Sequence, residues 1–174
     1  MSRTTERGLK ILIALSLLVL LYGLYRTFRQ NVIEAGDRAP EFSILADNGR
    51  AVSRSDFGGR LLVLNFWATW CPPCVSEMPA LSEFQKSFAA AGVVVLGISV
   101  DRNERAYRSL LAKQKVAFLT ARDPEARVSA SFGTFKYPET YLIDRDGKVV
   151  QKIIGAADWT DAAMVSQIKA LLSS

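Results

Sequence analysis

The sequence contains no histidine, and only two of its 174 residues are cysteines. Structural zinc sites usually take four protein ligands, so two cysteines without any histidine argue against zinc. Covalent haem attachment needs a histidine directly after the second cysteine of a Cys-x-x-Cys pair, whereas Val75 follows Cys74 here. The sequence therefore predicts no metal and no haem cofactor. Two interpretations of the cysteine pair remain, a structural disulfide and a redox-active dithiol.

The chain also lacks internal repeats and, beyond its N-terminus, any large excess of charge. The first thirty residues hold five of the 22 basic and one of the 17 acidic side chains, which leaves seventeen basic and sixteen acidic ones in the remainder. The basic residues between positions 102 and 115 fit the solvated face of a helix. We therefore expect no nucleic-acid partner.

An uncharged apolar run covers residues 11–25. As a helix it would be about 22 Å long, shorter than a hydrocarbon core of ~30 Å unless flanking residues contribute. A cleavable signal peptide is the alternative, but no small-x-small cleavage site follows directly. We expect residues 1–30 to be an uncleaved, single-pass anchor in the cell membrane. Three basic residues precede the run and two follow it, which predicts a cytoplasmic N-terminus.

The remainder is expected to be a linker, residues 31–36, and one globular domain, residues 37–174, on the periplasmic or extracytoplasmic side. Strand and helix patterns alternate along it and predict an α/β fold with a mixed central sheet flanked by helices, behind one N-terminal transmembrane helix. The expected elements are a β-hairpin from Phe42 to Val52, strands over 61–67, 93–100, 117–120, 140–143 and 148–154, and helices after the cysteine pair, over 104–113, from Asp123-Pro124 and from 158–161.

Cys71 and Cys74 follow the apolar run 61–67, at a predicted junction between a buried strand and a helix. Unpaired N–H groups and the partial positive charge of a helix N-terminus stabilise a thiolate there. A disulfide that closes so short a loop constrains the unfolded chain little, which disfavours a purely structural bond. We expect Cys71 to be the nucleophile and Cys74 to resolve the mixed disulfide.

Pro73 limits how strongly a Cys71 thiolate can be stabilised. An N-cap side chain accepts from the backbone N–H groups two and three residues ahead, and proline has no N–H. Only Cys74 can then donate to the Cys71 sulfur. This predicts a weakly stabilised thiolate and a reducing couple.

Three pieces of the sequence form a recognisable set: Asn65-Phe66-Trp67-Ala68-Thr69-Trp70-Cys71-Pro72-Pro73-Cys74, then Glu77 and Pro79, and Tyr137-Pro138-Glu139-Thr140-Tyr141-Leu142-Ile143-Asp144. With them the sequence resembles the thioredoxin-like proteins and, within them, the membrane-anchored thiol-disulfide reductases of the TlpA/ResA and cytochrome c maturation type. The resemblance runs from about Gly36 to the end of the chain. The resemblance implies a thioredoxin-like fold and a protein-disulfide reductase that uses its cysteines without a cofactor.

The resemblance also implies partners: a disulfide-bearing exported client such as apocytochrome c, a membrane thiol transporter as the electron donor, and lipid around the anchor. Reductases of this family carry a glutamate at the position of Glu77 as acid/base for the buried cysteine. Thioredoxins have an aspartate where Asn65 stands, and an amide cannot exchange protons in that way. The alternative for Glu77 is a solvent-facing helix residue.

The resemblance further implies that the loop at Pro138 faces the dithiol with a cis peptide bond and offers backbone groups to an extended substrate. Trp70, Tyr137, Pro138 and Glu139 are therefore the candidate substrate-binding residues, although Glu139 could equally be exposed and idle. Two other functions remain open. A peroxiredoxin-like peroxidase would want a threonine or serine three residues before its reactive cysteine, a place that Ala68 fills before Cys71. A non-enzymatic assembly chaperone is the third possibility.

Overall fold

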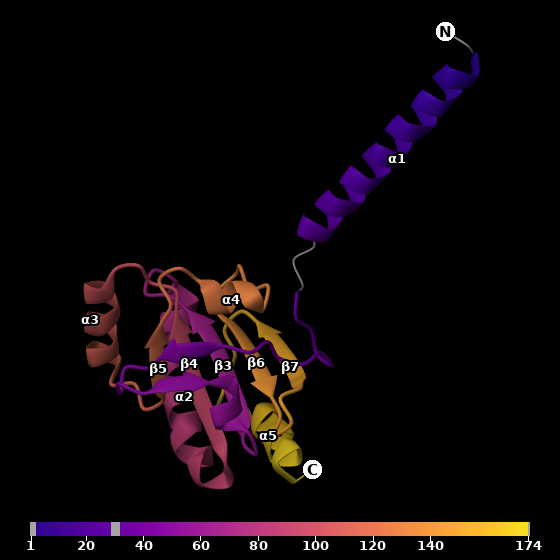
Figure 1. The fold of residues 1–174 in the computed structure, drawn as a ribbon. Helices are drawn as coiled ribbons and strands as arrows, with labels where there is room; N and C mark the ends of the chain where they lie inside the picture. Colours follow the sequence, from indigo (N-terminus) through magenta and orange to yellow (C-terminus); the bar gives the residue numbers. More distant parts are fainter. Residues whose placement is uncertain (1–2, 29–31, 174) are drawn as a thin grey trace. The chain divides into compact units, whose positions relative to one another are not determined.

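The structure, a computed structural model, describes residues 3–28 and 32–173, which belong to two compact units (Figure 1). The first unit contains one helix, α1 (Arg3–Phe28). Within the described residues, no helix combines the length and the apolar character needed to cross a bilayer. The predicted boundary between anchor and linker falls at residues 30 and 31, outside the described residues. The membrane anchor and the cytoplasmic N-terminus stay predictions.

The second unit is built on a five-stranded sheet with the strand order β5-β4-β3-β6-β7. Strands β3 (Leu61–Trp67), β4 (Val93–Ser99) and β5 (Leu119–Arg122) run parallel. Strand β6 (Glu139–Ile143) is antiparallel to β3, and β7 (Val149–Ile154) is antiparallel to β6. The predicted mixed sheet is confirmed, and β3 lies at its centre.

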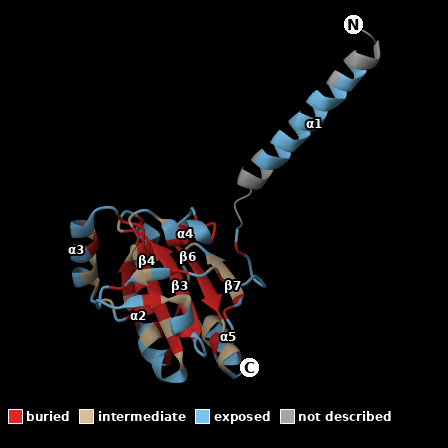
Figure 2. Cartoon of the chain, in the orientation of Figure 1, coloured by how far each residue is buried: buried red, intermediate tan, exposed pale blue. Residues whose placement is uncertain are grey.

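Two hydrophobic layers cover the sheet, and alternate residues of β3 point into each. Val63 and Trp67 join the layer formed with α2 (Pro72–Phe88), α5 (Ala162–Ser173) and the Tyr107 side chain of α3 (Glu104–Gln114). Leu64 and Phe66 join the layer formed with α4 (Arg127–Ser131) and the stretch from Ile33 to Phe57. Figure 2 shows the strands mostly buried, with helices on the outside.

The predicted N-terminal hairpin is confirmed. Strands β1 (Ser43–Leu45) and β2 (Ala51–Ser53) pair antiparallel, and Gly49 in the turn has a positive φ of 79°. A 3-10 turn, η1 (Arg54–Phe57), follows it, and a second one, η2 (Ala89–Ala91), extends α2. The unpredicted η1 turn is closed by the Asp56 carboxylate, which accepts from the Ser53 backbone N–H at 2.7 Å.

The predicted start of the short helix at Asp123-Pro124 is wrong, because α4 begins at Arg127. Ala126 adopts a left-handed φ of 54°, and its N–H donates to the Asp123 carbonyl, so a turn precedes the helix. The Asp123 carboxylate still accepts from the Val128 N–H at 2.7 Å. Asp123 therefore still caps the helix, although it lies outside the helix.

Candidate active site

The cysteine pair lies where the central strand passes into its following helix. Cys71 is the N-cap residue of α2, and both cysteines are buried in a disulfide whose Cα atoms are 5.3 Å apart. The Cys74 backbone N–H donates to the Cys71 sulfur at 3.3 Å. Pro73 has no N–H, so the predicted single donor at this N-cap is confirmed.

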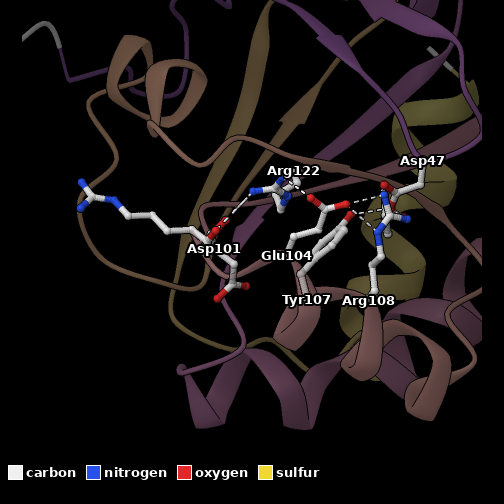
Figure 3. Close-up of polar contacts among 8 residues, drawn as sticks. Asp47, Asp101, Glu104, Tyr107, Arg108 and Arg122 are labelled. Carbon is white, nitrogen blue, oxygen red and sulfur yellow. Dashed lines mark hydrogen bonds and ion pairs between the residues drawn. The ribbon is translucent and has the colours of Figure 1, made fainter.

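An aspartate that sequence reasoning missed anchors the loop before the dithiol. The Asp101 carboxylate accepts from the Thr69 N–H at 2.8 Å, the Thr69 hydroxyl at 2.6 Å and the Ser99 hydroxyl at 2.6 Å. Figure 3 shows Arg122 beside Asp101, where its guanidinium donates to the Asp101 backbone carbonyl at 3.5 Å. Asp101 thus fixes the segment that presents Cys71.

A second polar group, around Asp47 and Tyr107, joins the hairpin turn to α3 and β5 (Figure 3). The Asp47 carboxylate, in the hairpin turn, accepts from the hydroxyls of Tyr107 at 2.5 Å and Thr120 at 2.7 Å. Burial, followed by the hydrogen bond to Asp47, raises the pKa of Tyr107 far above its usual range, so the phenol remains a donor. The Tyr107 ring stacks on Trp67, the last residue of β3, with centroids 5.6 Å apart.

Glu77 lies three residues after Cys74 on the buried side of α2, so the solvent-facing alternative is wrong. Its Oε1 accepts from Asn65 Nδ2 at 3.0 Å. Its Oε2 accepts from the Ala157 N–H at 3.1 Å and from Trp159 Nε1 at 3.4 Å. Burial raises the pKa of Glu77, and these three hydrogen bonds oppose the rise without cancelling it.

The loop before β6 packs beside the loop before the dithiol. The Tyr137–Pro138 peptide bond is cis, as expected. The Tyr137 ring meets Trp70 edge-on, with centroids 5.8 Å apart and planes at 77°. Trp70 is 64% exposed, so the pair presents an aromatic surface next to Cys71. Three of the four candidate substrate-binding residues therefore come together, and their contact with substrate stays a prediction.

Glu139 differs from the other three. It is buried, so the exposed and idle alternative is wrong. Its carboxylate accepts from the Tyr141 hydroxyl at 2.9 Å and pairs with Lys152 at 3.1 Å. Alternation along β6 places Thr140 on the opposite face, where its hydroxyl accepts from Asn65 at 2.9 Å. The Glu139 side chain is engaged within the fold, and a contact with substrate stays a prediction.

Sequence reasoning also missed the donors to Glu77 from the loop between β7 and α5. Ala157 and Trp159 lie about eighty residues from Glu77, and no local pattern connects them. One signal in the sequence could have pointed to this contact. Trp159 stands in a polar loop, and the N–H of a buried indole needs a hydrogen-bond acceptor. Over the described part of the chain, no cluster of histidine, cysteine, aspartate and glutamate could hold a metal ion.

Comparison with known proteins agrees with this geometry. The Redoxin family matches residues 34–172. The chain belongs to the Redoxin family. It is a thioredoxin-like protein-disulfide oxidoreductase of the ResA/TlpA type, in which the cysteine pair reacts without a cofactor.

Two relatives and one solved structure illustrate the likeness. The thiol-disulfide oxidoreductase ResA of Bacillus thuringiensis subsp. konkukian is 33% identical over 78% of each chain. The thioredoxin-like protein YneN of Bacillus subtilis is 36% identical over 79% of this chain and 85% of its own. The structure of a candidate thiol:disulfide interchange protein DsbE from Chlorobium tepidum superposes with a TM-score of 0.75, at 32% identity, over 80% of this chain and 99% of that one.

Proposed function

We propose that this oxidoreductase works as a reductant of disulfides in exported proteins, with Glu77 as the acid/base for Cys74. One observation carries the proposal. The Glu77 carboxylate is buried on the same side of α2 as Cys74, and each of its hydrogen bonds comes from an N–H group. Burial raises its pKa towards the range in which thiols exchange protons at working pH.

In the first step, the Cys71 thiolate of the reduced protein attacks one sulfur of the client disulfide. The client S–S bond breaks, and its other sulfur leaves as a thiolate that takes a proton from water. A mixed disulfide now joins Cys71 to the client. Trp70 and Tyr137 offer the surface against which the client segment lies.

In the second step, the buried Cys74 thiol gives its proton to the Glu77 carboxylate and attacks the Cys71 sulfur. The mixed disulfide breaks, the second client thiolate leaves, and the Cys71–Cys74 disulfide forms. Glu77 then releases the proton. The two electrons that reduced the client come from the dithiol, so an external thiol donor must restore it.

The N-cap of α2 supports this direction of electron flow. A Cys71 thiolate receives one backbone N–H, from Cys74, and so gains less stabilisation than one with two such donors. We expect a reduction potential near that of thioredoxin, about −270 mV, rather than the value of about −120 mV of a strong oxidant. Equilibration with glutathione buffers measures it, and a value near the oxidant would contradict the proposal.

Trapping identifies the client and tests the roles of the two cysteines. Cys74→Ser should accumulate a mixed disulfide through Cys71, because attack still occurs but resolution does not. Mass spectrometry of the adduct then shows whether the client is apocytochrome c or another exported protein. An adduct that forms through Cys74 in Cys71→Ser, and not in Cys74→Ser, would reverse the assignment. Insulin reduction measured beside peroxide consumption separates a reductase from a peroxidase, and a chaperone would do neither.

We also propose that residues 1–30 tether the domain to the cell membrane, outside the cytoplasm, where a membrane thiol transporter re-reduces it. The support is the uncharged run over residues 11–25 and its basic flanks. Extraction of membranes with alkaline carbonate tests the tether. The full chain should stay in the membrane fraction, and its release into the supernatant would contradict the proposal.

A further inference from the structure

The loop between β7 and α5 contacts the carboxylate of Glu77. Within it, Trp159 is buried and its ring packs against Phe84 of α2 at a centroid distance of 5.2 Å. Its indole Nε1 lies 3.4 Å from Glu77 Oε2, the same oxygen that accepts from the Ala157 N–H at 3.1 Å. The loop therefore supplies two of the three groups that hold this carboxylate.

These groups can only donate to Glu77. An indole N–H and a backbone N–H have no acceptor lone pair. The Asn65 Nδ2 group, which also donates to the Thr140 hydroxyl, is likewise a donor without an acceptor lone pair. Donors of this kind stabilise the ionised carboxylate more than the protonated one.

The charged groups on the surrounding elements are engaged elsewhere. On β7, Lys152 pairs with Glu34 and Glu139. In the loop, Asp158 accepts from Thr160, and Asp161 accepts from the backbone N–H groups of Ala163 and Met164. On α2 the neighbouring titratable group is the Cys74 thiol of the reduced protein. Among the described residues, no charged side chain contributes to the pKa shift of Glu77.

We propose that Trp159 is a positioning residue for thiol-disulfide exchange, which holds Glu77 Oε2 with its indole N–H and favours the ionised carboxylate that takes the proton of Cys74. The inference rests on the proposed acid/base role of Glu77. The proton passes from Cys74 Sγ to Glu77, while the new Cys71–Cys74 bond forms and the client thiolate leaves. In this role Trp159 acts through the Glu77 carboxylate and not on the sulfurs themselves.

Trp159→Phe tests this in the full-length protein, because it keeps an aromatic ring against Phe84 and removes the N–H. The readout is a ¹³C NMR titration of the Glu77 side-chain carboxyl in the oxidised state, assigned by the loss of its signal in Glu77→Gln. Loss of a donor should raise the Glu77 pKa by roughly half a unit or more. The pH profile of insulin reduction should move in the same direction.

Phe84→Leu is the matched control, because it loosens the packing of Trp159 and leaves all three donors. It should lower stability without moving the Glu77 titration. If Trp159→Phe does not fold, benzothienylalanine at position 159 keeps the shape of the ring and replaces the N–H with sulfur.

A titration unchanged by loss of the N–H, or moved equally by Phe84→Leu, overturns the positioning role. A different result overturns the acid/base proposal instead. In that case Glu77→Gln keeps the wild-type pH profile of insulin reduction, while Trp159→Phe still shifts the titration of the Glu77 carboxyl. The two failures are therefore distinguishable.

Discussion

Glu77 and Glu139 are two buried glutamates on opposite faces of the same sheet, and they differ in how their charge is compensated. Glu139 has a cation, Lys152, at 3.1 Å, and accepts from the Tyr141 hydroxyl. Glu77 has three N–H donors and, among the described residues, no cation. Both arrangements give the carboxylate oxygens hydrogen-bond donors, but only the pairing of Glu139 with Lys152 neutralises the charge.

The difference separates a structural carboxylate from a reactive one. A buried ion pair is costly to break, because removal of one partner leaves an uncompensated buried charge. A buried carboxylate that is compensated only by N–H dipoles keeps a raised pKa, and burial raises the pKa of Glu77 in this way. Such a carboxylate can exchange a proton with a neighbouring thiol. The position beside Cys74 makes this property useful.

Removal of the cation from Glu139 should have the largest effect on stability. Lys152→Met leaves the Glu139 carboxylate buried and unpaired, so we expect the free energy of unfolding at pH 7 to fall by about 3 kcal/mol. Urea denaturation at pH 7 measures it. A loss below about 1 kcal/mol would mean that Lys152 does not compensate Glu139.

Glu77→Gln should change how stability depends on pH. Burial raises the folded-state pKa of Glu77 above its ordinary value of 4.5, so folding favours the protonated form. Its contribution is fully present below pH 4.5 and is lost as the pH rises through the folded-state pKa. The wild-type free energy of unfolding minus that of the variant should therefore fall as the pH rises, in urea titrations from pH 4 to pH 8. A constant difference would contradict the raised pKa.

The smallest effect is expected where a charge pair is exposed. Lys86 and Glu83 form such a pair at 2.7 Å on the surface of α2. Lys86→Ala should cost less than about 0.5 kcal/mol of unfolding free energy. Thermal denaturation beside Lys152→Met makes the comparison, and equal losses would mean that burial does not account for the importance of Lys152.

Elements with a strong local signal could be predicted from the sequence. The bounded apolar run predicted β3 to the residue, and Pro73 predicted that only Cys74 would donate to Cys71. The start of α4 was missed because the left-handed Ala126 overrides the capping pattern at Asp123.

Contacts between distant segments could not be predicted in this way. Asp101 and Trp159 act on residues 32 and 82 positions away, and their pairing appears only once the sheet forms. Glu139 is next to Pro138 in sequence, but strand alternation turns its side chain to the face opposite Thr140. A functional role inferred for one residue from a motif therefore extends to the next residue only if both side chains point to the same face of the sheet.

The most direct test of this account is the pH dependence of insulin reduction for the wild type, Glu77→Gln and Glu139→Gln, under conditions in which resolution of the mixed disulfide limits the rate. We expect Glu139→Gln to keep the wild-type pH profile even if it is less stable. Glu77→Gln should be about tenfold slower or more at neutral pH, with a flattened profile, because Cys74 loses its proton acceptor. A wild-type profile in Glu77→Gln, or a flattened one in Glu139→Gln, would contradict the assignment of Glu77 as the acid/base of the dithiol.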